Sequence, residues 1–383
     1  MRTLTLDEAT LATCGAKAAT LATLRHAGVD VPDGFVIPFS EYHRHHASAS
    51  SRAKQPEPAL THAIDEQLRR LFKGSPERGH VAVRSSASHE DGHASSAAGQ
   101  YDTLLGMSGT ENVSRAVARC WASLQSGRAT AYRDHAGGEG APAMAVLIQR
   151  MVDPEVSGVL FTTTPRVIEA TVGLGEPLVS GHVTPDAWMI DDRGIRDRRP
   201  GTATHRLDRQ GNRLMRTALP AGDLMCLDDE QVFALDRHGR RIAEILDHPV
   251  DVEWAICHNR LHTLQARPIT ASPSPIRHGS QGLPASPGRA TGTARVLLGP
   301  QDFSRFREGD ILVCRATDPA WTPLFRYAAG IITETGGTLS HAAIVAREVG
   351  IPAVLAVPDA TTHYVDGTRV TVDGTTGRIE TRR

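Results

Sequence analysis

The stretch at residues 336–348 reads GGTLSHAAIVARE, and it follows the apolar run GIIT at residues 330–333. The apolar run predicts a buried strand, Ser340 is a natural N-cap, and Gly350 predicts the end of a helix. His341 therefore opens a helix directly after a diglycine loop. Backbone N–H groups at a helix start are unpaired and lie at the positive end of the dipole, so an anion is favoured there. A histidine in a first helical turn is often only structural, but this setting suits a transient phosphohistidine.

The residues around this stretch carry a family resemblance. Residues 338–354 resemble the phosphohistidine domain of enzymes related to phosphoenolpyruvate synthase, pyruvate phosphate dikinase and rifampin phosphotransferase. The match continues in DPAWTPL at 318–324, in GLPASPGRA at 282–290 and in VDGTTG at 372–377. The resemblance implies that the chain carries the family's phosphohistidine domain and that His341 is its catalytic residue.

Composition sets wider limits. The chain has 383 residues, enough for two or three domains, and 40% of them are hydrophobic, as in soluble proteins. No apolar run approaches the roughly 20 residues needed to span a bilayer, and no signal-like segment opens the chain, so we expect a cytoplasmic protein without membrane contact. A net charge of −1 argues against nucleic acid as a partner. The five scattered cysteines predict reduced thiols rather than disulfides.

Two cationic residues in the first hundred positions are candidates for phosphate contacts. Lys17 follows Gly15 at the start of an amphipathic helix, and the run at 81–91 predicts a strand that leads from Arg84 into a Ser-rich loop. A lone lysine is usually a solvated surface residue, and an arginine in a strand is as often part of a structural ion pair. A guanidinium group can nevertheless donate two hydrogen bonds to one phosphate. The resemblance implies that Lys17, Arg84 and the nearby Thr103 bind ATP.

The apolar run AVLIQRMV at residues 145–152 resembles the adenine-side hinge of an ATP-grasp site, where the backbone after a strand binds the base. Gln149, Arg150 and Val152 are therefore candidate lining residues. They are equally well explained as ordinary groups at a strand end.

Alternation in VDVEWAI at residues 250–256 places Asp251 and Glu253 on one face of a strand, opposite the apolar residues. A turn at His258-Asn259 predicts a hairpin whose second strand presents Gln265 and Arg267 on one shared face. The hairpin can thus offer acid, amide and guanidinium groups to a single ligand.

Mg²⁺ prefers oxygen ligands and often combines one or two protein groups with nucleotide phosphates, which suits Glu253 and Gln265, with Asp251 assisting. A solvated polar face is the simpler explanation of the pattern by itself. The resemblance implies that the acid and the glutamine contact the metal, and that Arg267 contacts phosphate. ATP and Mg²⁺ are thus the expected substrate and cofactor.

These segments predict two domains, one α/β and one α+β. We expect an ATP-grasp nucleotide-binding domain at residues 1–272, a Pro/Ser-rich linker at 273–281, and a swivelling phosphohistidine carrier domain at 282–383. Further strands of the carrier are predicted at 292–298, 310–314 and 368–372. The family's pyruvate-binding barrel needs about 250 residues, so we expect this chain to lack it.

The resemblance implies an ATP-dependent, dikinase-like phosphotransferase that moves the β-phosphate of ATP through His341 to a small-molecule acceptor and releases AMP and phosphate. Three alternatives stay open: the ATP-binding subunit of a split dikinase with a separate acceptor protein, an ATP-driven condensing enzyme, and a nonenzymatic phosphocarrier. One departure from dikinase relatives is Leu339, since they commonly carry a threonine two residues before the histidine. Control through that hydroxyl should be absent.

Overall fold

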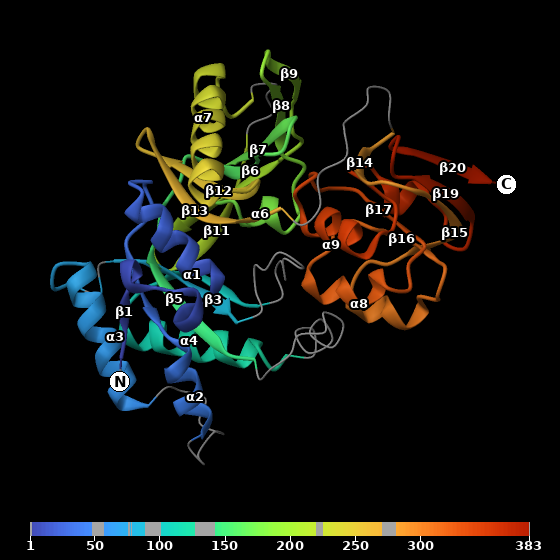
Figure 1. Cartoon of the computed structure of the whole chain (residues 1–383). Coiled ribbons are helices and arrows are strands. Elements are labelled where there is room, and N and C mark those ends of the chain that lie inside the picture. Colours follow the sequence, from blue (N-terminus) through green and yellow to red (C-terminus); the bar gives the residue numbers. More distant parts are fainter. Residues whose placement is uncertain are drawn as a thin grey trace.

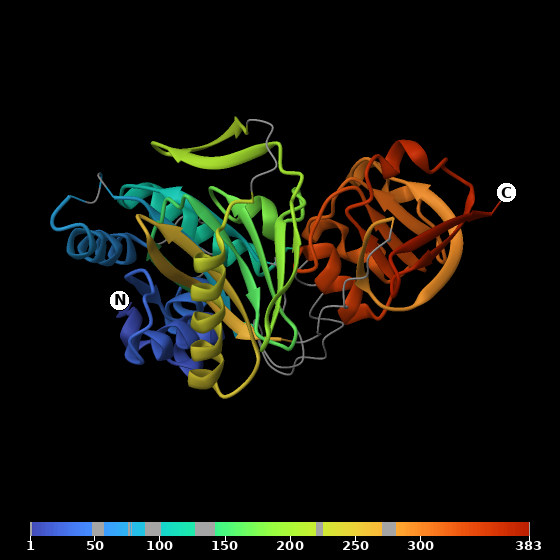
Figure 2. The ribbon, with the colours of Figure 1, turned by 90° about the horizontal axis from the view of Figure 1, so that it is seen from above.

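The computed structural model describes residues 2–47, 57–75, 77, 79–88, 101–126, 142–219, 225–269 and 281–382. Within these residues, the chain forms two lobes, which together contain the candidate nucleotide-binding residues, and a third unit, which contains His341 (Figures 1 and 2). We call these the first lobe, the second lobe and the carrier unit. Apart from Gln281, the predicted linker at 273–281 lies outside the described residues.

The first lobe is an antiparallel five-stranded sheet covered by helices. Its strands lie in the order β1 (Leu4–Thr5), β2 (Gly34–Ile37), β5 (Met144–Arg150), β3 (Val81–Ala87) and β4 (Thr103–Met107). Helices α2 (Phe39–Ala47), α3 (Pro58–Leu71) and α4 (Thr110–Ser123) pack on one face. Helix α1 (Leu11–His26) contributes to the core on the other face, which continues into the second lobe.

Alternation along the central strands decides which side chains face the second lobe. Met144, Val146 and Ile148 of β5 belong to the core under α2, α3 and α4, so Gln149 points to the opposite face. On β3, Val83 faces that same core, and Arg84 therefore faces the second lobe.

The second lobe is an antiparallel six-stranded sheet. Its order is β13 (Arg260–Pro268), β12 (Val250–Cys257), β6 (Val156–Phe161), β7 (Arg166–Val172), β8 (Asp186–Asp191) and β9 (Gly194–Arg199). Helix α7 (Asp229–Leu246) packs its apolar residues on one face, and the short helix α6 (Glu176–Val179) contributes Leu178 and Val179 to the apolar cluster on the other. The apolar alternation predicted for 250–256 is confirmed, since Val250, Val252, Trp254 and Ile256 all enter the core shared with α7.

A two-stranded hairpin, β10 (His205–Gln210) and β11 (Arg213–Ala218), extends from the second lobe and contacts the first (Figure 2). His80 of the first lobe contacts Asn212 at the hairpin turn, at 2.9 Å between Nε2 and Oδ1. Near the same turn, Arg209 forms an ion pair with Asp153, which lies in the chain just after β5. The hairpin therefore ties the two lobes together on one side.

The carrier unit is a mixed seven-stranded sheet. Its strands lie in the order β14 (Leu283–Ser286), β18 (Ala353–Leu355), β17 (Gly330–Thr333), β16 (Ile311–Cys314), β15 (Arg289–Val296), β19 (Arg369–Asp373) and β20 (Arg378–Arg382). Four neighbouring strands, β18, β17, β16 and β15, run parallel. The short helices α8 (Thr322–Phe325) and α10 (Ala360–His363) and the 3₁₀ turns at Pro300–Arg305 and Pro319–Trp321 connect the strands. The predicted strands at 292–298, 310–314 and 368–372 correspond to β15, β16 and β19.

Residues 330–350, which contain the diglycine loop and His341, fold as predicted, with one difference at Ser340. Strand β17 leads through the diglycine loop into α9 (His341–Val349), and Gly350 closes the helix with a left-handed φ of 78°. Ser340 occupies the N-cap position in extended conformation, but its hydroxyl donates to the Gly337 carbonyl at 2.9 Å instead of capping the helix. The loop before α9 is instead held by a side chain of the second lobe.

Candidate nucleotide and phosphohistidine sites

Arg84 lies at the centre of a cluster that joins the two lobes. Its guanidinium donates to Gln265 Oε1 at 2.6 Å and to Glu253 Oε2 at 3.2 Å, both on the β12–β13 hairpin. It also donates to the Leu264 carbonyl and, at 3.4 Å, to Gln149 Oε1. Only 7% of Arg84 is exposed. The structure thus brings together three of the predicted ATP-binding side chains around one cation.

Asp251 and Arg267 lie beside this cluster as a buried ion pair. They face each other across β12 and β13, and the Arg267 guanidinium donates to Asp251 Oδ2 at 2.8 Å. Burial raises the pKa of Asp251, and the Arg267 charge opposes that rise. The predicted hairpin, its turn at His258-Asn259 and its polar face are confirmed.

The oxygens of this face suit a magnesium ion. Asp251 Oδ1 is buried without a hydrogen-bond partner among the described residues, while Glu253 and Gln265 each direct a side-chain oxygen at Arg84. The described part of the chain contains no group of three His, Cys, Asp or Glu residues able to hold a metal. Mg²⁺ does not need one, because nucleotide phosphates and water complete its shell. The residues fit the predicted role, which stays a prediction.

Lys17 and Thr103 lie close to Arg84 in the fold. Gly15 interrupts α1 with a φ of 79°, and a side chain there would meet Ser86 Oγ at 2.8 Å, so the turn brings α1 against β3. Lys17 follows this turn, is 5% exposed, and donates to the Ser85 carbonyl at 2.7 Å. It is therefore not the solvated lysine that is common at surfaces. Thr103 is paired with Arg84 across β3 and β4 and is exposed.

The predicted hinge residues separate in the structure. Gln149 is buried beside Arg84 and donates to the Pro32 carbonyl at 3.1 Å. Arg150 instead lies on the opposite face, where its guanidinium covers the Phe72 ring and donates to the Leu71 carbonyl. Alternation along β5 explains this difference, because consecutive residues of a strand point to opposite faces.

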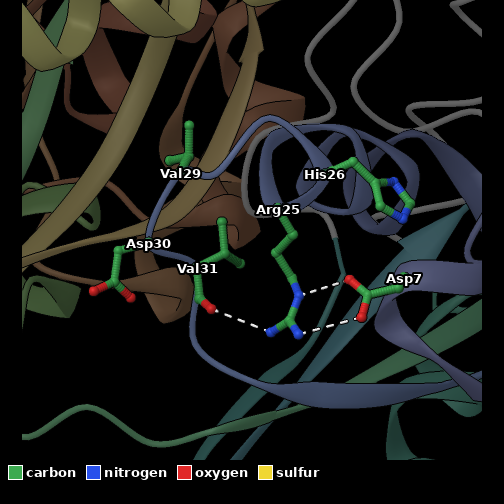
Figure 3. Close-up of a pocket in the computed structure, with 6 residues that line it drawn as sticks. All are labelled: Asp7, Arg25, His26, Val29, Asp30 and Val31. Atoms are coloured by element: carbon green, nitrogen blue, oxygen red, sulfur yellow. Dashed lines mark hydrogen bonds and ion pairs between the residues drawn. The ribbon is translucent and has the colours of Figure 1, made fainter.

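Val152 lines an open cavity of about 570 Å³ together with Arg25, Asp33, Arg150 and His258, away from the Arg84 cluster. A neighbouring pocket of about 500 Å³ is lined by Asp7, Arg25, His26, Val29, Asp30 and Val31 (Figure 3). In it the Arg25 guanidinium is bound by both Asp7 oxygens, at 2.7 and 3.3 Å. Neither cavity contains Lys17, Arg84 or Glu253, so neither coincides with the predicted phosphate site.

His341 lies at the start of α9 with its ring inside the carrier unit. Only 4% of the residue is exposed. The Thr317 hydroxyl contacts Nδ1 at 3.0 Å, the Thr322 hydroxyl contacts Nε2 at 3.2 Å, and the Phe325 ring lies against the imidazole edge-on. Burial lowers the pKa of His341 to about 4. The ring is therefore neutral near pH 7, the form in which an imidazole nitrogen is nucleophilic.

The low pKa of His341 predicts that the free energy of unfolding depends on pH. Below pH of about 6.5 the unfolded chain protonates His341 while the folded chain does not, so stability falls between pH of about 6.5 and about 4, by up to about 3 kcal/mol. Replacing His341 by Gln removes this contribution. Urea unfolding of both proteins at neutral and acidic pH measures it, and an equal stability difference at both pH values would contradict the depressed pKa.

Sequence reasoning missed three residues at these sites. Thr322 lies in the signature at 318–324 and Thr317 directly precedes it, but no role follows from either position, and none follows from the sequence for Glu169. The available signal for Glu169 was weak: it is a single acid in an otherwise largely apolar strand, on the face opposite Ile168 and Ala170. What it contacts lies 169 residues further along the chain.

The fold and the clustered side chains define an ATP-grasp-type nucleotide-binding unit joined to a histidine-bearing mobile domain. The chain belongs to the family described as pyruvate phosphate dikinase, AMP/ATP-binding domain, whose model matches residues 49–278. A second family, PEP-utilising enzyme, mobile domain, matches residues 306–377. The predicted family and fold class are thereby confirmed, while the roles of single residues stay predictions.

Curated relatives agree with this membership. The chain is 34% identical to a probable phosphoenolpyruvate synthase of Archaeoglobus fulgidus over 98% of its own length and 57% of the relative. It is 35% identical to the phosphoenolpyruvate synthase of Pyrococcus furiosus over 82% of the chain and 43% of the relative. A solved NMR structure of Enzyme I is 31% identical over 21% of this chain and 34% of that chain, with a TM-score of 0.20, too low to bear on the fold.

The chain thus spans about half the length of the curated relatives that it matches. Among the described residues, no helix is both long enough and apolar enough to cross a membrane.

Proposed function

We propose that this chain is an ATP-dependent phosphotransferase of dikinase type, in which His341 carries the β-phosphate of ATP to a small-molecule acceptor. The observation that carries the proposal is the cluster of Arg84, Glu253 and Gln265 between the two lobes. Phosphoryl transfer depends chiefly on positioning and on charge neutralisation, and this cluster combines a guanidinium with metal-binding oxygens. Residues 1–272 would then act as the nucleotide domain and 282–383 as the carrier.

In the first step, a ring nitrogen of His341 bonds to the β-phosphorus of ATP. The bond from that phosphorus to the oxygen shared with the α-phosphate breaks, and AMP leaves with this oxygen. The imidazole keeps the proton on its other nitrogen, within hydrogen-bond distance of Thr317 or Thr322. Water then attacks the terminal phosphorus, inorganic phosphate leaves, and the remaining phosphoryl group stays on the ring.

Side chains of both lobes would neutralise the phosphates during this step. Arg84, Lys17 and Arg267 are buried cations on the facing surfaces, and they would exchange their present partners for phosphate oxygens. Asp251, Glu253 and Gln265 would hold Mg²⁺, which when bound neutralises charge that develops on the phosphate oxygens.

In the last step, an acceptor oxygen attacks the phosphohistidine phosphorus and the P–N bond breaks. The relatives are named phosphoenolpyruvate synthases, which supports a small organic acceptor. Since this chain spans about half of their length, we assign none of its residues to the acceptor. Purification with and without candidate partner proteins separates an acceptor bound by this chain from one bound by a separate subunit.

ATP labelled at single phosphates tests the proposal. Incubation with Mg²⁺ should leave β-phosphate label on His341, in an acid-labile linkage, and should release AMP. Retention of γ-label together with ADP release would reject the dikinase-type path. Protein that takes up neither label would reject transfer to His341 altogether.

A further inference from the structure

Glu169 of the second lobe is bound entirely by the loop that precedes His341. The residue is 2% exposed. Its carboxylate accepts hydrogen bonds from the Thr338 N–H at 2.6 Å, the Thr338 hydroxyl at 2.5 Å and the Leu339 N–H at 3.2 Å. All three donors come from the carrier unit, and they begin three residues before His341. A buried carboxylate with these partners stabilises one placement of the carrier against the second lobe.

Apolar packing surrounds this contact. Leu339 is 2% exposed and belongs to a cluster with second-lobe side chains, namely Val159, Phe161, Leu178 and Val183. The Thr335 hydroxyl donates to the Gly181 carbonyl at 2.7 Å, just beyond α6 (Figure 1). Gly337 leaves no free space, since a Cβ atom there would lie 2.3 Å from Glu169 Oε2. We call this set of contacts the carrier dock.

The carrier dock lies in the same row of the sheet as the predicted metal ligands. Glu169 is paired with Val159, Val159 with Glu253, and Glu253 with Gln265, across β7, β6, β12 and β13. Paired residues share a face, and neighbouring strands lie about 4.8 Å apart, so Glu169 stands about 10 Å from Glu253 on the same face. Docking on Glu169 therefore brings the start of α9 to the candidate phosphate site.

The charge of Glu169 makes this dock sensitive to what His341 carries. The carboxylate occupies backbone N–H groups immediately before the helix, where the helix dipole favours an anion. A phosphoryl group adds a charge of about −1.5 to −2. On His341 it would stand close to a buried carboxylate, and like charges in a poorly solvated place repel strongly. Burial raises the pKa of Glu169, while the hydrogen bonds from Thr338 and Leu339 and the charge of Arg347 oppose that rise and favour the carboxylate.

We propose that Glu169 is a positioning residue that docks the empty carrier beside the nucleotide, and that phosphorylation of His341 displaces the loop from Glu169 and releases the carrier. The release step rests on the proposed function, whereas the dock does not. Recruitment and release would thus depend on one carboxylate. Leu339 supplies the apolar packing of the carrier dock.

Hydrogen exchange of residues 335–341 tests the dock without catalysis, because the Thr338 and Leu339 amides donate to Glu169. In Glu169→Ala their exchange should accelerate about 10- to 100-fold, the effect of losing hydrogen bonds to a charged group. Gly337→Ala should give the same result from the carrier side, since its Cβ displaces the carboxylate. Glu155→Ala is the matched control, an exposed acid of the second lobe that binds the His258 N–H instead. Unchanged exchange in both dock variants would overturn the proposal.

The variant Glu169→Gln separates the effect of the side chain's charge from the effect of its shape, because it removes the charge and keeps the size. Its amide oxygen can keep both Thr338 hydrogen bonds, whereas its NH2 group cannot accept from the Leu339 N–H, so the Thr338 amide of the empty carrier should stay protected. In the wild type, phosphorylated protein should exchange faster at 335–341, and His341→Glu, a charged stand-in that needs no ATP, should do the same. When Glu169→Gln is also present, phosphorylation and His341→Glu should each accelerate the exchange much less. Equal protection of empty and loaded carrier in the wild type would refute release by charge.

Kinetics distinguish positioning from a general structural role. Glu169→Ala should slow labelling of His341 about 10-fold or more while nucleotide affinity stays within about twofold, because only the encounter of the two units is impaired. Labelling at the wild-type rate would overturn the positioning role. If the wild type itself takes up no label, the proposed function fails, and the exchange of Glu169→Ala still decides the dock.

Discussion

His341→Ala should form no acid-labile phosphoprotein from ATP labelled at the β-phosphate, a loss of about 10³-fold or more in labelling. The reason is that no other described histidine lies at the start of a helix with both ring nitrogens held by hydroxyls. A removed nucleophile cannot be replaced by the positioning groups that remain. Quantifying label after rapid quench measures the effect.

The same variant should bind ATP within about twofold of wild-type affinity, since the ring makes no hydrogen bond with the Arg84 cluster and binding energy comes from other groups. His341→Gln serves as the conservative control, because an amide can keep a hydrogen bond to a neighbouring threonine. Wild-type labelling in either variant would place the phosphoryl group on another residue and would remove the basis for the relay.

Arg84→Ala should reduce the rate of His341 labelling by about 10²- to 10³-fold, the usual effect of losing a donor that stabilises developing charge. Arg84→Lys should recover only part of this activity, because an ammonium group lacks the planar fork that binds one phosphate through two bonds. Single-turnover labelling across ATP concentrations separates the loss of binding from the loss of rate.

Arg150→Ala is the matched control for this experiment. It removes another arginine of the first lobe, also at a position predicted from sequence, but its side chain packs on Phe72 and contacts none of the cluster. We expect a change of less than about threefold, as for most exposed substitutions. If Arg84→Ala were as mild as Arg150→Ala, Arg84 would be only a structural link between the lobes.

That structural role is real in the present arrangement. Arg84 pairs with Glu253, which is the ion pair that the sequence alone offered as the alternative to phosphate binding. The two roles are compatible, since a guanidinium that bridges the lobes before nucleotide arrives can exchange carboxylate and amide oxygens for phosphate oxygens. The expected difference between Arg84→Ala and Arg84→Lys decides how much of the residue's effect is catalytic.

Local patterns were sufficient to predict several parts of this protein. The β12–β13 hairpin follows from alternation and a two-residue turn, and the β17–α9 unit follows from an apolar run, two glycines and a helix stop. Each of these signals acts between residues that are close in the chain. The family could also be predicted, because its motifs are contiguous.

Long-range placement could not be predicted in this way. Arg150 was grouped with Gln149 from adjacency, yet the faces of β5 separate them, and only the packing of α3 gives Arg150 its partners. The position of His341 at a helix start does not show what surrounds its ring, and the structure encloses it with Thr317, Thr322 and Phe325. Enclosure depends on loops that meet only after the carrier sheet has formed.

The sequence by itself determined that a histidine opens a helix after a diglycine loop, and that acid, amide and guanidinium groups share one face of a hairpin, because periodicity and turn chemistry are local properties. Only the tertiary structure decided that Glu169 holds the loop before His341 and that Leu339 fills an apolar site of the second lobe. Those contacts join residues about 170 positions apart, and they exist only where two separately folded sheets meet.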